Sequence, residues 1–393
     1  MLPPRSIAGH APALDRDVLR AILQRSGPWP RDPAGLAARV GDLLGRQPAR
    51  WVAEPEDALL AALAEGLPTL HLALPAFGPP GYDAARLPAD ARVHWMEPAR
   101  GRLDPGPSEI AEALAAGANA VLLTPLAGDC SALPAARTLC ADRGARLAVD
   151  ARASMAARVL DGGPAAWGDV TLVPVDADGG PSPCSGAILL GDRDPVDAPR
   201  GSRQPRLLLR SLASSLRDEP RLRRLLPSPP ARPPVDERRS SPPGWAFAAA
   251  AARAEQASQR CTQRARHART LSVHCSHLPA IQVPPSVPGH HAAGLAVPLL
   301  ARNRDEVAAE LARMGVELVE CGARLLAPEA EQGDRARDVA DRLLALPLHP
   351  YYRPKDIDWL AERLRQATLR ANGDGSADPT EAVDYAAKAA GEL

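Results

Sequence analysis

The chain has 393 residues, of which 45% are hydrophobic, and its 47 Lys and Arg residues balance 47 Asp and Glu residues. This length and apolar content exclude a disordered chain and allow a core large enough for two domains. The net charge of zero argues against a dedicated nucleic-acid-binding protein.

Helix and strand patterns alternate between residues 57 and 190. Helices are predicted at three segments, residues 57–66, 108–116 and 133–142. Strands are predicted at five short apolar segments, residues 69–74, 120–124, 147–149, 170–174 and 187–190. This alternation indicates an α/β fold with a mainly parallel sheet covered by helices on both faces. Ligands bind such sheets at the carboxyl ends of strands, which is where Asp150 stands.

The stretch from residue 194 to 244 differs in character, because it is rich in Arg and Pro. It can be interpreted as a basic binding arm or as a partly ordered crossover on the surface. We favour the crossover, since such composition is typical of connecting segments.

The C-terminal part of the chain predicts a second, smaller α/β region. Residues 245–269 contain neither Gly nor Pro and predict one long helix. Residues 295–300 predict an edge strand, because Pro298 lacks the N–H group that an inner strand needs. Asn303 and Glu306 have the spacing of a capping box at the start of the next helix.

That helix carries Val307, Leu311 and Met314 on one face, and a last helix is marked by the apolar stripe of Ile357, Leu360 and Leu364. A strand is predicted between them at residues 316–319. The expected division is a large domain over 1–200, an Arg/Pro-rich crossover over 201–244, a linking helix and small α/β domain over 245–370, and a polar tail over 371–393.

The start of the chain and its cysteines favour a cytoplasmic protein. Residues 1–10 contain no long apolar run, and no stretch approaches the roughly 20 apolar residues of a membrane-spanning helix. The six cysteines are scattered and include no CxxC pair, which indicates reduced, mostly buried thiols.

Short motifs occur along the chain in an order that resembles one known family. Residues 74–77 read Leu-Pro-Ala-Phe, residues 147–151 read Leu-Ala-Val-Asp-Ala, and residues 346–350 read Leu-Pro-Leu-His-Pro. They resemble the VIVPAF, LVIEDAAQA and LPLHP motifs of the DegT/DnrJ/StrS family of sugar aminotransferases. Gly168-Asp169-Val170 and the segment from Ser185 to Leu189 resemble the GDIG and GGAIL motifs.

The resemblance covers roughly residues 27–366. It implies the fold-type-I architecture of enzymes that use pyridoxal phosphate (PLP), with a large domain and a smaller C-terminal one. It also implies that Asp150 stands where the family pairs a carboxylate with the pyridinium nitrogen of PLP, and that Phe77 lies near the position of the aromatic ring that stacks on the cofactor.

The family's other cofactor contacts are replaced in this chain. A Ser-Gly-Thr that would hold the phosphate aligns with Glu54-Pro55-Glu56, where proline supplies no N–H and two carboxylates oppose a dianion. The His or Gln that supports the ring is Ala153, and the serine on the next strand falls near Val173 or Pro174. These changes lie together on the cofactor side of the expected cleft.

The Schiff-base lysine is also missing. Counting back from Asp192, its position falls on Asp178, which cannot form an imine. The chain's only lysines are Lys355 and Lys388, both near its end. We therefore expect no bound cofactor, and we assign Asp150, Asp178, Phe77, Glu54, Glu56, Ser182 and Ser185 to a vestigial cleft.

Other polar groups allow alternatives that stay open at this point. Asp150 is either a retained functional carboxylate or a strand-end residue that a loop N–H satisfies. Asp176 and Asp178 either form an acid/base set with Asp150 or lie in a solvated loop. Cys130 is a candidate nucleophile, but no histidine is placed beside it by sequence, so a plain thiol is favoured.

The histidines suggest no catalytic or metal site. His274, Cys275 and His277, with Cys261 or Cys321, fit no standard zinc spacing, so no metal is expected. His290 and His291 are predicted to be a loop pair.

These observations favour a degenerate aminotransferase homologue that does not act as a PLP transaminase by itself. The resemblance implies dimers with active sites at the subunit interface. We therefore expect a homodimer, or a heterodimer with an active aminotransferase paralogue, in bacterial sugar or specialised-metabolite biosynthesis, without nucleic-acid or membrane partners.

Two alternatives remain. The first is a PLP-independent enzyme that uses the reshaped cleft, a small-molecule ligand and the carboxylates of Asp150 and Asp178. The second is an ordinary PLP aminotransferase whose lysine is unrecognised.

Overall fold

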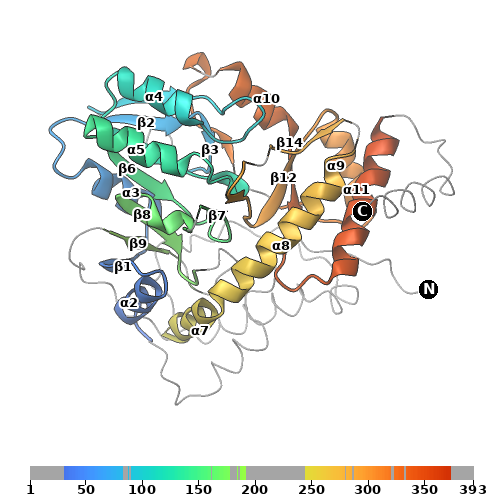
Figure 1. Ribbon diagram of the computed structural model, residues 1–393, viewed down its shortest axis with the longest axis horizontal. Helices are drawn as coiled ribbons and strands as arrows, with labels where there is room; N and C mark the ends of the chain where they lie inside the picture. Colours follow the sequence, from blue (N-terminus) through green and yellow to red (C-terminus); the bar gives the residue numbers. More distant parts are fainter. Residues whose placement is uncertain are drawn as a thin grey trace.

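The computed structural model describes residues 31–82, 87, 90–160, 162–177, 184, 186–191, 244–278, 280–285, 287–319, 323–331 and 333–372. Two sheets organise these residues, a large one on the N-terminal side and a small one on the C-terminal side (Figure 1). None of the described helices is long and apolar enough to cross a membrane.

The large sheet has seven strands in the order β1-β9-β8-β6-β5-β2-β4. Its strands are β1 (Ala49–Val52), β2 (His71–Pro75), β4 (Arg92–Met96), β5 (Ala120–Leu123), β6 (Arg146–Asp150), β8 (Val170–Pro174) and β9 (Ala187–Leu190). Five neighbours, from β8 to β4, run parallel, with Val121 opposite Leu147 and Val149 opposite Thr171. Strand β9 pairs antiparallel with β8, and β1 pairs antiparallel with β9. The predicted mainly parallel sheet is therefore confirmed.

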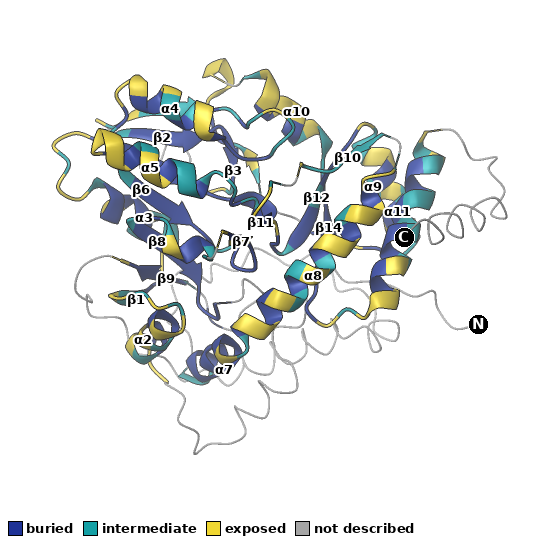
Figure 2. Cartoon of the chain, in the orientation of Figure 1, coloured by how far each residue is buried: buried dark blue, intermediate teal, exposed yellow. Residues whose placement is uncertain are grey.

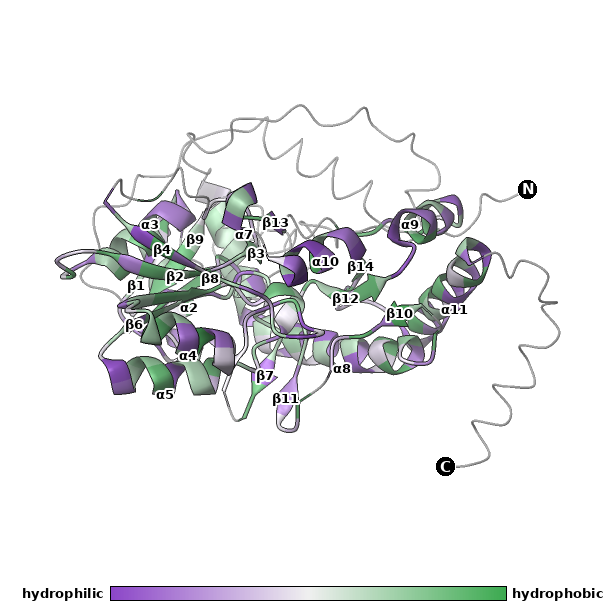
Figure 3. Ribbon diagram, turned by 90° about the horizontal axis from the view of Figure 1, so that it is seen from above, coloured by the Kyte–Doolittle hydropathy of each residue, from purple (hydrophilic) through white to green (hydrophobic). Residues whose placement is uncertain are grey.

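Helices cover both faces of this sheet because its strands are apolar on both sides. In β5, Val121 and Leu123 face one apolar cluster, and Ala120 and Leu122 face another. The first cluster includes side chains of α2 (Pro33–Leu43), α4 (Pro107–Ala115), α5 (Leu133–Arg143) and α7 (Gly244–Glu255). The second includes α3 (Pro55–Ala64), which Figure 3 shows on the opposite side of the sheet from α4 and α5.

The small sheet is antiparallel and has the order β10-β12-β14. Its strands are β10 (Ile281–Gln282), β12 (Ala296–Ala301) and β14 (Leu343–Pro347). Helices α8 (Ala257–Cys275), α9 (Arg304–Arg313) and α11 (Pro354–Ala371) pack around it, while α10 (Asp334–Arg342) lies against β12. The predicted stripe of Ile357, Leu360 and Leu364 is buried in this second core. Figure 2 shows the buried strands and helix faces of this part in dark blue.

Two short strand pairs connect the halves. Strand β3 (Phe77–Gly78) pairs with β13 (Arg324–Leu325), and β7 (Arg158–Val159) pairs with β11 (His290–His291). The prediction that His290 and His291 form a loop pair is therefore wrong. They form a strand because the chain before β12 returns to the large domain.

The predicted single helix over 245–269 is wrong, since α7 and α8 are separated at Gln256. Helix α7 packs on α2 in the large domain, whereas α8 packs on α11 and β12 in the small one. The break therefore follows a change of packing partner, which neither Gly nor Pro marks in the sequence.

Residues 295–300 were predicted to form an edge strand, but β12 is the middle strand of its sheet. Strand β10 pairs with it only at Leu300 and Ala301. On the β10 side of β12, Pro298 is paired with none of the described residues. The N–H that proline lacks is therefore not needed for the pairing with β10.

Two smaller predictions in this region are also wrong. The side-chain amide of Asn303 does not cap α9 but donates to the carbonyl of Ala371 and to Asn372, at the end of α11. Residues 316–319 form no regular strand and contact the sheet through single bonds, such as that from the N–H of Val319 to the carbonyl of Ala345.

Candidate functional site

Asp150 is the last residue of β6, at the carboxyl edge of the parallel strands, and it is 5% exposed. Its Oδ1 accepts bonds from the backbone N–H of Arg152 at 3.1 Å and from Nε of Arg152 at 3.0 Å. Its Oδ2 accepts bonds from Nη2 of Arg152 at 2.7 Å and from the hydroxyl of Tyr82 at 2.8 Å. Both carboxylate oxygens are therefore engaged within the chain, in part by the loop N–H that the sequence suggested.

Arg152 joins Asp150 to a second carboxylate. Its Nη2 donates to Oε1 of Glu56 at 2.8 Å, so one guanidinium bridges the end of β6 and the first turn of α3. Tyr82 is fully buried beside them. We call Glu56, Tyr82, Asp150 and Arg152 the Arg152 cluster.

The local sequence explains how the cluster assembles. Glu56 stands in the first turn of α3, where the positive end of the helix dipole favours a carboxylate. The loop that brings in Tyr82 passes Glu56 at Gly81, whose φ is +113°. A Cβ at Gly81 would lie 2.6 Å from Cγ of Glu56, so this close approach requires glycine.

The electrostatics of the cluster fix its protonation state at neutral pH. Burial alone would raise the pKa of Asp150, but the charge and hydrogen bonds of Arg152 and the Tyr82 hydroxyl outweigh it and lower that pKa. Burial, followed by the charge of Asp150, raises the pKa of Tyr82 well above its usual value. Asp150 is therefore ionised, and Tyr82 is a neutral donor.

Of the other predicted cleft residues, the two that the structure describes, Phe77 and Glu54, add no polar group to this cluster. Phe77 is 2% exposed and packs in an apolar cluster with Leu103, Leu126 and Leu300. Glu54 is exposed at the N-cap of α3 and makes no side-chain capping bond. Asp178, Ser182 and Ser185 lie outside the described residues.

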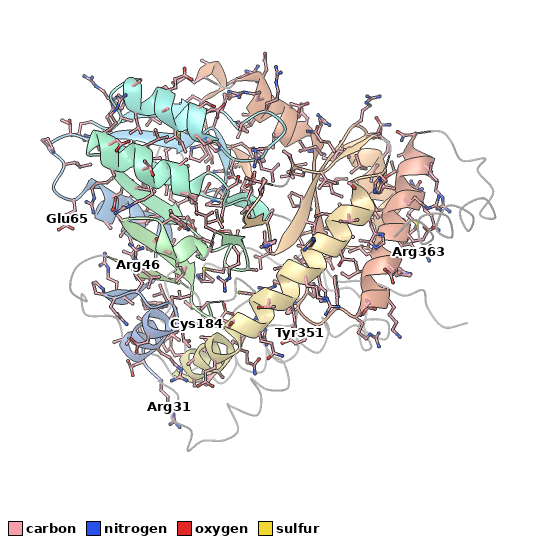
Figure 4. All side chains as sticks on the ribbon, viewed as in Figure 1. Arg31, Arg46, Glu65, Cys184, Tyr351 and Arg363 are labelled. Carbon is pink, nitrogen blue, oxygen red and sulfur yellow. The ribbon has the colours of Figure 1, made fainter. Side chains whose placement is uncertain are left out.

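Asp176 is buried, and the prediction of a solvated loop is wrong for this residue. It is 0% exposed and forms an ion pair with Nη1 of Arg253 on α7, at 3.2 Å. Burial, and then the charge of Asp176, raises the pKa of the Cys184 thiol, which Figure 4 labels in this part of the molecule. The ion pair of Asp176 and Arg253 anchors α7 to the loop after β8.

Cys130 lies beside a histidine that the sequence did not place there. The N–H of Cys130 donates to Nε2 of His290 at 3.0 Å, and Nδ1 of His290 is 3.9 Å from Oδ1 of Asp129. Burial raises the pKa of the Cys130 thiol far above its usual value, so the sulfur stays protonated. The contact joins β11 to the loop after β5 and gives no activated nucleophile.

Because His290 is buried, we expect the stability of the fold to decrease in acid. Burial lowers the pKa of His290, and the charges of Arg102 and His291 lower it further. Asp129 and the Gly128 carbonyl act in the opposite direction but do not outweigh burial. Below about pH 6.5 the unfolded chain binds a proton that the folded imidazole does not, so stability is lost as the pH falls.

When the pH is lowered from about 7.5 to about 5.5, we expect the free energy of unfolding to decrease less in His290→Gln than in the parent protein. Urea denaturation at the two pH values measures this difference. Burial also lowers the pKa of His267, so both proteins keep some loss of stability in acid from this residue. Equal losses in the two proteins would contradict the assignment to His290.

Among the described residues no group of three or more His, Cys, Asp or Glu side chains is placed to hold a metal ion. His274 lies 3.6 Å from Oδ1 of Asp358, and the Cys261 thiol donates to the Met155 carbonyl. Cys321 lies outside the described residues.

Comparison with known proteins bears on the architecture. Neither a protein-family model nor a curated protein matches the sequence. An aminotransferase of the DegT DnrJ EryC1 StrS group from Brucella abortus superposes with a TM-score of 0.65 at 18% identity, over 89% of this chain and 94% of that one. The chain has the fold of the DegT/DnrJ/StrS-type sugar aminotransferases.

Two further solved structures share this DegT/DnrJ/StrS-type fold. The aminotransferase TlmJ from Streptoalloteichus hindustanus gives a TM-score of 0.67 at 23% identity, covering 93% of this chain and 100% of that one. The E. coli GDP-4-keto-6-deoxy-D-mannose-3-dehydratase, with bound hydrated PLP, gives 0.67 at 13% identity, covering 92% and 100%. The fold-type-I architecture expected from the motifs is confirmed, and at these identities the likeness concerns the fold.

The described residues around the end of β6 do not fit PLP. Asp150, which the resemblance assigns to the pyridinium nitrogen, already bonds Arg152 and Tyr82 through both oxygens. At the start of α3, Pro55 has no N–H to offer a phosphate, and Glu56 adds a negative charge. Lys355 is exposed at the start of α11, which lies at the other end of the molecule from β6 in Figures 1 and 3.

No sequence motif placed Arg152 or Tyr82 at this site. The available signals were a basic residue two positions after the strand-end Asp150, in an otherwise small and apolar segment, and a tyrosine after Pro79-Pro80-Gly81. Neither signal states that the two side chains meet.

Proposed function

We propose that this protein is a non-catalytic partner subunit of an active aminotransferase of the same fold. The observation that carries the proposal is the Arg152 cluster, in which both oxygens of Asp150 are bonded within the chain. A chain without a cofactor site can still contribute a surface and loops to a dimer. The resemblance supports this role, because it implies active sites built at a subunit interface.

The pathway is proposed to be bacterial sugar or specialised-metabolite biosynthesis. The support is by analogy of fold, since the similar structures include a GDP-4-keto-6-deoxy-D-mannose-3-dehydratase and several sugar aminotransferases. The expected location is the cytoplasm, where such sugar nucleotides are made and used.

The test is co-expression with an aminotransferase encoded beside this protein in its own host. We expect a heteromer in native mass spectrometry, with any PLP on the second chain. We also expect the activity or soluble yield of the aminotransferase to rise several-fold. If its mass, activity and solubility are unchanged by this protein, the partner role is wrong.

The alternative of a PLP-independent enzyme is less well supported. It requires Asp150 to exchange a proton, but its pKa is lowered and its oxygens are held by Arg152 and Tyr82. Its proposed second carboxylate, Asp178, lies outside the described residues. Asp150→Asn separates the two proposals, because it should abolish the activity of such an enzyme and leave the activation of a partner intact.

A further inference from the structure

Arg152 is the cation at the centre of the Arg152 cluster. Its guanidinium contacts Asp150 at 2.7 Å and Glu56 at 2.8 Å, and the three side chains are 27%, 4% and 19% exposed respectively. The two carboxylates come from different elements, β6 and α3, and are 94 positions apart in the sequence, from 56 to 150. One side chain thus links two layers of the large domain.

The geometry leads to a role for this cation. We propose that Arg152 is a built-in organic cation that completes the cleft in place of a bound cofactor, by neutralising Asp150 and joining it to Glu56. The chain's own side chain thereby holds the position that a ligand would otherwise need to fill. This inference goes beyond the proposed partner role, because it concerns the single chain and holds with or without a partner.

The charge balance supports this role. Asp150 and Glu56 carry two negative charges, Arg152 carries one positive charge, and Tyr82 stays neutral because burial raises its pKa. Without the guanidinium, Asp150 and Glu56 would both lose a cation that they contact, in a largely buried space. Removing one partner of such a group is costly, because the remaining charges lose their compensation.

The packing supports it as well. Gly81, at φ +113°, lets the loop close over Glu56, where any Cβ would lie 2.6 Å from Cγ of Glu56. Tyr82 then seals the cluster at 0% exposure. The backbone is therefore shaped around Glu56 and Arg152.

Chemical rescue tests the proposal. In Arg152→Ala, the thermal unfolding midpoint should fall by about 5 °C or more. Millimolar methylguanidinium should restore part of this loss, while equal concentrations of sodium or tetramethylammonium should not. The matched control is Arg365→Ala, which removes a guanidinium from an exposed pair with Glu362 and should shift the midpoint little and show no rescue.

A second variant covers the case in which Arg152→Ala does not fold. The variant Glu56→Gln/Asp150→Asn/Arg152→Met contains none of the three charges, so it should fold and be insensitive to methylguanidinium. The proposal is overturned if Arg152→Ala is as stable as Arg365→Ala, or if methylguanidinium shifts the parent protein and Arg152→Ala equally. It is also overturned if the charge-free variant fails to fold, since the cluster would then need more than a counter-ion.

Discussion

Gly128→Ala is expected to destabilise this protein by about 3 kcal/mol or more, or to prevent its folding. Gly128 has φ +91°, and a Cβ there would lie 2.2 Å from the carbonyl carbon of Ala293 and 2.4 Å from its oxygen. These are backbone atoms, and the bond from Cys130 to His290 fixes the same two segments. Neither segment can withdraw without opening the junction between the loop after β5 and the chain before β12.

Gly144→Ala is the matched control. Gly144 also has a positive φ, +63°, but a Cβ there meets no atom within 4 Å. It ends α5 on the surface, so alanine should cost only about 1 kcal/mol of backbone strain. Denaturant unfolding of both variants measures the difference, and similar losses in the two would show that the Gly128–Ala293 approach is unimportant.

The second large effect concerns the buried pair of Arg253 and Asp176. Both side chains are 0% exposed, so Arg253→Met removes a counter-ion from a carboxylate that water cannot reach. We expect a loss of about 3–5 kcal/mol in the free energy of unfolding. Arg253→Met/Asp176→Asn should recover much of it, because the double variant removes both charges of the pair.

The control for this prediction is an exposed pair. Arg137→Met breaks the ion pair with Asp169, whose side chains are 47% and 32% exposed, and should cost within about 1 kcal/mol. Urea denaturation of the three variants and the parent protein measures these losses. If Arg253→Met and Arg137→Met are equally mild, the buried pair contributes no more than a surface one.

Much of the fold could be predicted from sequence because local pattern and tertiary role agree. Strands 170–174 and 187–190 coincide with β8 and β9, and each is apolar on both faces. Helix α5 ends at Gly144, which has the left-handed conformation that glycine adopts readily at the end of a helix. Where the packing partner changes without a local signal, as at Gln256 between α7 and α8, the prediction failed.

The site was less predictable, because its defining contacts join distant segments. The sequence indicated that Asp150 ends a strand, and the resemblance implied that Glu56 stands where the family binds a phosphate. Neither indicated that Arg152 bridges the two. Likewise, His290 reaches Cys130 across 160 positions through the pairing of β7 and β11. Such contacts depend on the assembled fold rather than on any spacing along the chain.

The most direct test of the account is borohydride reduction of the purified protein after incubation with PLP, followed by intact-mass measurement and peptide mapping. An active aminotransferase of the same fold, treated identically, is the positive control. Because both oxygens of Asp150 are bonded within the chain, we expect no stoichiometric adduct and no retained PLP after dialysis. A single stoichiometric adduct on Lys355 or Lys388, with PLP retained, would contradict the account and show that the protein binds PLP as an internal Schiff base.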